Sequence, residues 1–425
     1  METVNYPLRN EWSKLLQRPA IDTASLEQTV NEVLLEVQKN GDSAIKKFTL
    51  KFDKVQINQL LVNEGEFEEA EKTCSPELKA AIQLAKNNIE KFHISQKEEI
   101  KIIETVPGVN CWRKSVGIEK VGLYIPGGSA PLFSTILMLG VPATLAGCKE
   151  IILCSPPNSE GKLDPAILYT AKLVGITKVF KVGGVQAIAA MAFGTESVPK
   201  VYKIFGPGNQ YVTCAKQLVN KNGTAIDMPA GPSELGLVAD ETCVPAFVAA
   251  DLLSQAEHGE DSQVILISTS EKIISEIKTE VYKQLDLLPR KIIAAKALEN
   301  SKAFLVNSID EAVELINDYA PEHLIIACKN EEELAEKIIN AGSIFLGNYS
   351  CESAGDYASG TNHALPTNGY AKAYSGVSLD SFVKKITVQK ITQQGINNIG
   401  LAIELMAEAE GLQAHKNAVT IRLTK

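Results

Sequence analysis

The sequence has no cluster of basic residues, and its formal net charge is −9 at pH 7. Proteins that bind nucleic acids or anionic membranes usually present such clusters, so both partners are excluded and a small molecule is favoured. The eight cysteines are scattered, without a C-x-x-C pair or the dense spacing of a disulfide scaffold. The first residues lack the basic and then apolar pattern of a signal peptide. We therefore expect a cytoplasmic protein with reduced thiols.

We predict no membrane-spanning helix, although residues 121–148 contain no charged side chain. That run is long enough in principle to cross a bilayer. Gly127, Gly128, Pro131 and Pro142 divide it, however, and such residues interrupt a spanning helix. We predict a buried strand, a glycine loop and a buried helix instead.

The common nucleotide-binding fingerprints are absent as well. Residues 161–163 read Gly-Lys-Leu and do not match a Walker loop. The run GPGN at 206–209 is followed by Tyr211 where the Rossmann fingerprint G-x-G-x-x-G requires glycine. The loop YIPGGSAP has its own spacing, and glycines after strands also serve ordinary tight turns. Glycine spacing alone therefore does not establish a nucleotide site.

The pattern that is present alternates strands with helices. At 425 residues, the chain is long enough for two or three domains. Apolar residues at helical spacing predict a helical lead-in over 24–100. Short apolar strands then alternate with helices from residue 120, and again after 240, with helices near 271–288, 309–319 and 331–340. This predicts an α/β protein with two Rossmann-like parallel-sheet domains, a helical N-terminal segment and a C-terminal helical tail, and ligands at the carboxyl ends of the strands.

A long irregular segment follows the second alternation. Residues 347–378 are rich in small and polar residues and have no strong periodicity. A connection of about 30 residues is unusually long for a passive loop, so we expect it to carry function. An amphipathic piece near 380–394, a helix near 397–409 and a short closing segment come after it.

The candidate functional residues are the histidines and their neighbours in the sequence. The chain has only five histidines. Four of them lie after residue 257, and each has a carboxylate or an amide close by in the sequence. The pairs are Gln255 with His258, Glu322 with His323, Asp356 with His363, and Glu410 with His415. A single histidine is most often an ordinary core or surface residue, whereas four such pairs indicate metal binding and proton transfer.

A metal site is indicated by Gln255 and His258, which share a helical face if the predicted helix continues that far. The alternative is that Gly259 ends the helix and that His258 meets only the last carbonyl groups. Asp356 would add a carboxylate oxygen, and His415 a second imidazole. Two nitrogens and two oxygens suit zinc, with manganese or cobalt as substitutes, and leave positions open for a substrate.

A proton-transfer pair is indicated by Glu322 and His323. They follow Pro321, which disfavours helix at Ala320 and marks a turn before the strand HLIIAC. Neighbours in a regular strand point to opposite faces, whereas a turn at the strand edge could aim both side chains into one cleft. The pair would then offer two proton acceptors, suitable for an alcohol and for water. A solvated loop pair is the alternative.

The chain contains, in this order, the blocks GLYIPGGSAPLFSTILML, GGVQAIAAMAFGTESVPKVYKIFGPGN, IDMPAGPSELGLVAD, LLSQAEHGEDSQ, APEHL, GDYASGTNHALPT and AHKNAV. Together these blocks closely resemble the histidinol dehydrogenase family, and the resemblance runs from about residue 20 to the C-terminus.

The resemblance implies an NAD-dependent enzyme, with one zinc per subunit, that oxidises L-histidinol twice, through L-histidinaldehyde, to L-histidine, the last step of histidine biosynthesis. The family's metal ligands fall on Gln255, His258, Asp356 and His415. Its catalytic pair falls on Glu322 and His323, and its NAD contacts fall on Tyr124, Gln186 and Asn209. Its substrate contacts fall on Ser233, Gln255, His258, His323, Asp356, Glu410 and His415, with His363 close to the site.

The family is a homodimer with crossing tails, which implies that Glu410 and His415 complete the site of the other subunit. We accordingly predict a first Rossmann-like domain from 24–120 and 234–378. An NAD-binding domain would occupy 121–233, and a dimer arm or tail would comprise 1–23 and 379–425.

Other interpretations stay open. The chain could be a dehydrogenase for another polar alcohol, a zinc amidohydrolase without NAD, or a non-catalytic metal-binding protein. An aldehyde dehydrogenase with a thiol nucleophile is disfavoured, because no cysteine lies inside the metal or Glu-His motifs. The nearest is Cys351, five residues before Asp356.

Overall fold

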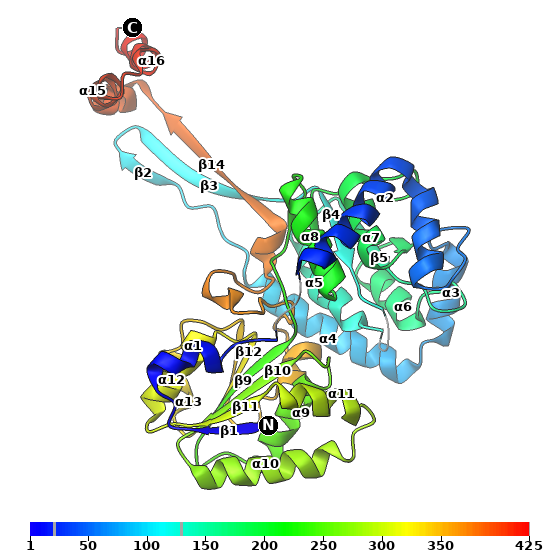
Figure 1. Ribbon diagram of the computed structural model, residues 1–425. Helices are drawn as coiled ribbons and strands as arrows, with labels where there is room; N and C mark the ends of the chain where they lie inside the picture. Colours follow the sequence, from blue (N-terminus) through cyan, green and yellow to red (C-terminus); the bar gives the residue numbers. More distant parts are fainter. Residues whose placement is uncertain (20–22, 128–130, 425) are drawn as a thin grey trace.

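The computed structural model describes residues 1–19, 23–127 and 131–424 (Figure 1). Part of the predicted loop YIPGGSAP, residues 128–130, lies outside the described residues. Two parallel sheets and a separate antiparallel sheet organise the rest. None of the described helices combines the length and the apolar character that crossing a bilayer requires.

The larger sheet has six strands in the order β1-β11-β10-β9-β12-β13, and every neighbouring pair is parallel. The strands are β1 (Glu2–Asn5), β9 (Glu234–Ala239), β10 (Gln263–Ser268), β11 (Lys302–Leu305), β12 (His323–Ala327) and β13 (Ser343–Leu346). Counted from β9, the order is 3-2-1-4-5, as in a Rossmann fold. β1 adds one strand at the edge of this sheet, beside β11.

The smaller sheet repeats the same order with five parallel strands, β6-β5-β4-β7-β8. The strands are β4 (Lys120–Tyr124), β5 (Glu150–Ser155), β6 (Lys178–Lys181), β7 (Lys203–Phe205) and β8 (Ala225–Ile226). The two parallel sheets confirm the predicted pair of Rossmann-like units. The described part of the uncharged run 121–148 contains a buried strand and the buried helix α5, as expected.

Helices cover the faces of both sheets, because parallel strands with buried residues on both sides need apolar cover above and below. On the smaller sheet they are α5 (Phe133–Leu145), α6 (Pro165–Leu173), α7 (Gly184–Phe193) and α8 (Gln210–Lys221). On the larger sheet they are α9 (Pro245–Ala256), α10 (Glu271–Leu285), α11 (Lys291–Glu299), α12 (Ile309–Tyr319) and α13 (Glu331–Ala335). The helix predicted over 331–340 is therefore shorter than expected. Short pieces are η1 (Arg9–Glu11), α1 (Trp12–Leu15), α14 (Glu352–Tyr357), η2 (Tyr370–Lys372) and η3 (Leu379–Phe382).

The helical lead-in packs on the smaller sheet. Its helices are α2 (Thr23–Phe52), α3 (Glu64–Thr73) and α4 (Pro76–Ile94). Val30, Val33 and Val37 of α2 share one buried cluster with Ile188 of α7 and Val212 of α8. The expectation that 24–120 groups with 234–378 therefore fails for these helices, because their apolar faces are matched by α5 to α8 instead.

An arm projects from the two α/β units (Figure 1). It is a three-stranded antiparallel sheet, β14-β3-β2, of β2 (Ile103–Val106), β3 (Val109–Gly117) and β14 (Val383–Ile391). Helices α15 (Gln393–Ala409) and α16 (Gln413–Leu423) lie at its tip. The amphipathic piece near 380–394 is thus a strand, and it pairs with β3. The N-terminal residues expected in the arm lie at the edge of the larger sheet instead, because β1 pairs with β11.

Candidate active site

The residues predicted to contact NAD lie at the carboxyl edge of the smaller sheet. Tyr124 is the last residue of β4, Gln186 is in the first turn of α7, and Asn209 immediately precedes α8. The Asn209 side chain caps α8 by accepting hydrogen bonds from the backbone N–H groups of Tyr211 and Val212, at 3.1 and 3.2 Å. This edge is the usual ligand-binding edge of a Rossmann-like sheet.

Two features of this edge fit a nucleotide. Gly206 has a φ of 127°, and a Cβ there would collide with the carbonyl oxygen of Tyr124. The turn that leads to Asn209 therefore requires glycine. Among the described residues, the buried Gln186 Oε1 has no hydrogen-bond partner, although its Nε2 donates to Asp53 Oδ2 at 3.5 Å. A buried polar atom without a partner is costly, and a bound ligand would satisfy it.

Glu322 and His323 lie at the amino edge of the larger sheet, not at a carboxyl edge. His323 is the first residue of β12, and Ser233 immediately precedes β9, so both lie at the amino ends of the strands in the larger sheet. The prediction that ligands bind at the carboxyl ends of the strands is therefore wrong for the predicted site residues of the larger sheet. The position of the pair follows from the local backbone. Ala320 takes a left-handed conformation (φ 53°) that ends α12, and Pro321 begins the short connection to β12.

Glu322 and His323 are buried and lie close together, as the predicted turn requires. The distance from His323 Nδ1 to Glu322 Oε2 is 3.7 Å. The backbone N–H of Glu234 donates to Glu322 Oε2 at 3.0 Å, which fixes the carboxylate. His323 Nε2 is buried, finds no hydrogen-bond partner in the part of the chain that the structure describes, and lies 3.7 Å from Asp356 Oδ1. The pair is therefore not a solvated loop pair.

The pKa values in this cluster are perturbed. Burial raises the pKa of Glu322 to about 7. Burial alone would lower the pKa of His323, but the carboxylates of Glu352, Glu322 and Asp356 outweigh it and raise that pKa to about 10. Burial would raise the pKa of Asp356, but the close approach and charge of His323 outweigh it and lower that pKa. Groups with such shifts are typical of catalytic sites.

A candidate metal site lies beside this pair. Ligand atoms of His258, Glu352 and Asp356 all lie within 4.8 Å of one another. Gln255 joins them, since its side-chain amide faces the Glu352 carboxylate, 3.1 Å from Oε2. The predicted helix does not continue to His258, because α9 ends at Ala256. The turn after α9 brings His258 to the cluster instead.

Glu352 is the member of this cluster that the sequence analysis missed. It is buried, and burial raises its pKa to about 8. A usable signal was present, because Glu352 precedes Asp356 by four residues and such residues share one face of a helix. The helix α14 that carries both was hidden inside the irregular segment 347–378.

The same segment places His363 at the site. His363 Nδ1 lies 3.0 Å from the backbone carbonyl oxygen of Asp356, and its Nε2 lies 3.1 Å from Thr135 Oγ1 on α5. Burial lowers the pKa of His363. The imidazole thus connects the metal cluster to a helix of the smaller sheet.

The two remaining predicted residues are not in this cluster. Glu410 and His415 are exposed; Glu410 directly follows α15 and His415 lies on α16, at the tip of the arm and far from the two sheets (Figure 1). Within one chain, the structure brings together Gln255, His258 and Asp356 but not His415. The predicted ligand set is therefore incomplete in a single subunit.

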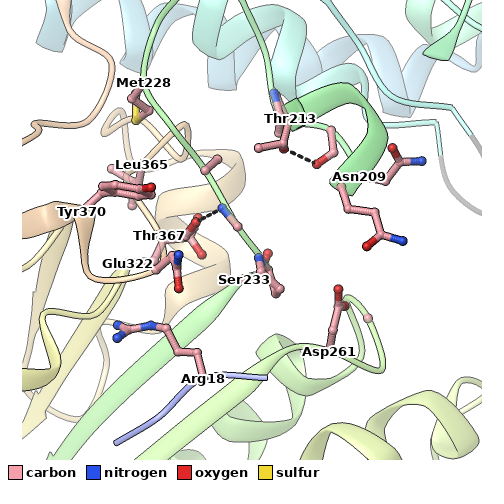
Figure 2. A pocket seen from close by; sticks show the side chains of 18 of the residues that line it. Arg18, Asn209, Thr213, Met228, Ser233, Asp261, Glu322, Leu365, Thr367 and Tyr370 are labelled. Carbon is pink, nitrogen blue, oxygen red and sulfur yellow. Dashed lines mark hydrogen bonds between the residues drawn. The ribbon is translucent and has the colours of Figure 1, made fainter. Parts of the chain in front are cut away.

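A cavity of about 1150 Å³ joins the two edges. Asn209 contributes to its wall from the smaller sheet, and Ser233, His258 and Glu322 contribute from the larger one. Figure 2 shows Asn209, Ser233 and Glu322 around one open space. A pocket of this size can hold a dinucleotide and a small substrate side by side.

Comparison with known proteins identifies relatives along the whole chain. A family model described as histidinol dehydrogenase matches residues 16–423. A histidinol dehydrogenase from Bacteroides thetaiotaomicron is 63% identical, over 100% of this chain and 99% of the relative. A histidinol dehydrogenase from Yersinia pestis is 52% identical, over 96% of this chain and 92% of the relative. The crystal structure of histidinol dehydrogenase from Elizabethkingia anophelis superposes with a TM-score of 0.98 at 58% identity, covering 100% of this chain and 98% of that one.

Proposed function

Because the chain belongs to the histidinol dehydrogenase family and is an oxidoreductase, we propose that it oxidises L-histidinol through L-histidinaldehyde to L-histidine, the last step of histidine biosynthesis. The proposed cofactors are NAD and one zinc ion per subunit, which manganese or cobalt could replace. The observation that carries the proposal is the buried Glu322-His323 pair beside the metal cluster, with Glu322 in the wall of a cavity that also reaches Asn209.

The residues present fit a divalent metal. Three carboxylates, those of Glu322, Glu352 and Asp356, lie around the imidazole of His323, and a bound cation would stabilise their charged forms. Gln255, His258 and Asp356 would hold the ion, together with His415 of another subunit. Imidazole nitrogens and amide or carboxylate oxygens suit zinc. The metal would supply a Lewis-acid anchor for the amine and imidazole nitrogens of the substrate.

The residues at the other edge fit NAD, which would accept one hydride in each oxidation. Tyr124, Gln186 and Asn209 are its proposed contacts. Ser233, His363 and the metal-holding residues would orient the substrate between the two edges. Holding the aldehyde in this cavity between the two oxidations would keep a reactive intermediate from escaping.

The proton steps are assigned to the Glu-His pair. In the first oxidation, His323 would take the hydroxyl proton of the alcohol while a hydride leaves its carbon. The nearby carboxylates raise the pKa of this imidazole, and a cation held by Asp356 would offset their charge, so that His323 is neutral when it accepts the proton. In the second oxidation, Glu322 takes a proton from a water molecule that attacks the aldehyde carbon, and a second hydride leaves. The overall change consumes one water and two NAD, which balances the loss of four electrons.

The division of labour is tested with Glu322→Gln. We expect this variant to retain aldehyde formation better than aldehyde oxidation, because the amide cannot accept the proton of water. The rates of NADH formation from L-histidinol and from L-histidinaldehyde are compared with those of Glu314→Gln, an exposed control. Equal loss of both half-reactions in Glu322→Gln would refute the assignment.

We also propose a homodimer in the cytoplasm. The arm exposes apolar side chains on its strands and helices, including Ile103, Ile386, Leu401, Leu405 and Met406. Exposed apolar side chains gathered on one arm favour its burial against another chain. A second subunit would then bring its Glu410 and His415 to the cavity. All eight cysteines are free, which fits a reducing compartment.

A further inference from the structure

Arg18 lies against the amino edge of the larger sheet, although it belongs to the N-terminal segment after α1. Its Nη2 donates to Glu234 Oε2 at 2.9 Å, and its Nε donates to Glu234 Oε1. Nη2 also donates to the carbonyl oxygen of Tyr319 at 2.7 Å, and the guanidinium carbon lies 4.2 Å from the centre of the Tyr319 ring. Arg18 is thus held by a two-pronged ion pair and a stacked aromatic ring, the arrangement that suits arginine and not lysine.

Glu234 connects this ion pair to the proposed catalytic base. It is the first residue of β9 and is almost fully buried. Its carboxylate accepts from Arg18 and from the backbone N–H of Asn368, at 2.7 Å for Oε1. Its own backbone N–H donates to Glu322 Oε2 at 3.0 Å. The chain of direct contacts therefore runs from Arg18 through Glu234 to Glu322.

The charges along this chain depend on one another. Burial raises the pKa of Glu234, and Arg18 opposes that rise. Without Arg18, Glu234 would be a buried carboxylate without a cation, and it would have to take up a proton or move. Either change would reach the backbone N–H that fixes Glu322. Figure 2 shows Arg18 and Glu322 beside the same cavity, where both contribute to the wall.

We propose that Arg18 is a positioning residue for Glu322, acting through Glu234, so that the N-terminal segment is part of the machinery of the second oxidation. The inference rests on the proposed role of Glu322 as the base that activates water. It assigns Arg18 no direct contact with substrate or cofactor. Its functional contribution is to keep Glu234 charged and in place.

The test compares Arg18→Gln, Arg18→Lys, Glu234→Gln and the double variant Arg18→Gln/Glu234→Gln. Arg9→Gln is the matched control, because Arg9 also pairs with a glutamate and lies 5.4 Å from a tryptophan ring, but on the exposed surface. For each protein, kcat and KM are measured separately for L-histidinol and for L-histidinaldehyde, and thermal unfolding is followed in parallel.

We expect Arg18→Gln to slow aldehyde oxidation by roughly 10- to 100-fold, the range for a displaced catalytic group, with a smaller effect on alcohol oxidation and on KM. Arg18→Lys keeps the charge and should recover part of the rate. In the Glu234→Gln background, Arg18→Gln should cause little further loss, because both act through one contact. If Arg18→Gln does not fold, Arg18→Lys and Glu234→Gln carry the test by the same preferential loss of aldehyde oxidation.

Several outcomes would overturn the inference. A rise in KM without slower turnover would mean that Arg18 binds substrate directly. Multiplying losses in the double variant would mean that Arg18 and Glu234 act separately, and equal slowing of both half-reactions would indicate only a structural role. If the wild type, Arg9→Gln and Arg18→Gln are all equally active, the positioning role alone is refuted. An inactive wild type would refute the proposed function and the positioning role together.

Discussion

Single carboxylates around His323 decide the chemistry at the residue scale. The three that lie closest to the imidazole come from two separate segments: Glu322 precedes β12, whereas Glu352 and Asp356 lie on α14. His258 approaches the last two from the turn after α9. Each residue is ordinary in its own sequence context, and only the fold makes the group a site.

Glu352 should contribute to metal retention. We expect Glu352→Gln to weaken zinc binding by roughly 10- to 100-fold, because Glu352 lies among the candidate ligand atoms and contacts the Gln255 amide. Zinc content after dialysis against a graded series of chelator concentrations measures the change. Glu332→Gln, an exposed change in α13, is the control and should bind zinc like the wild type. Unchanged zinc retention in Glu352→Gln would remove Glu352 from the site.

Asp53 should make stability depend on pH. Burial raises the pKa of this carboxyl to about 6, so the folded protein binds its proton more tightly than the unfolded chain does. The ionised side chain therefore costs stability as pH rises from about 4 through about 6. Asp53→Asn removes this cost, so its gain over the wild type should be larger at pH 8 than at pH 4. We expect about 1 kcal/mol, because solvent screens a partly exposed group.

Urea unfolding of the wild type and of Asp53→Asn at both pH values checks this prediction. A gain that is equal at pH 4 and pH 8, or larger at pH 4, would mean that the burial of Asp53 carries no pH-dependent cost.

The residue types at the site could be predicted from sequence, and their assembly only in part. Pairing of histidines with carboxylates picked out His258, His323 and Asp356, which the structure brings together. Glu352 has no histidine beside it in the sequence, so the same rule passed over it. The role of Glu234 in holding Glu322 depends on strand pairing between β9 and β12, which no local pattern reveals.

At the element scale, local patterns predicted elements that local residues determine. The strands and most helices of both α/β units follow from apolar runs and turn residues, and the structure confirms them, whereas α13 ends earlier than predicted and α9 stops before His258. The arm differs, because β14 pairs with β3 at positions such as Ile386 with Lys114, far apart in the chain. Residues 380–394 look amphipathic in isolation, and only this long-range pairing makes them a strand.

The arm should deliver residues to the site of a second subunit. Mixing His258→Ala with His415→Ala protein under conditions of subunit exchange would then recover activity. In a mixed dimer, one site carries both changes and the other carries neither, so equal mixing predicts about a quarter of wild-type activity. Each variant alone should stay inactive.

Subunit exchange is verified by mass spectrometry of differently labelled chains. Exchange without any recovery of activity would show that each subunit uses its own His415, and the proposed crossing of the tails would be wrong.

At the scale of the whole molecule, the two Rossmann-like sheets face the cavity with opposite edges. The smaller sheet presents its carboxyl edge, where Asn209 contributes to the cavity wall, and the larger sheet presents its amino edge, where Ser233 and Glu322 contribute. The sequence predicted both sheets but gave no information on their mutual orientation. The sequence also could not predict that α2 packs on the smaller sheet, because an apolar helix face does not specify its partner.

Under the proposed function, one cavity would serve both oxidations without release of the aldehyde. The most direct measurement supplies zinc-loaded protein with limiting L-histidinol and excess NAD, and counts NADH and histidine formed per substrate. We predict two NADH and one histidine for each L-histidinol consumed, with no free aldehyde. One NADH with released aldehyde would contradict the shared cavity, and no NADH at all would contradict the proposed dehydrogenase activity.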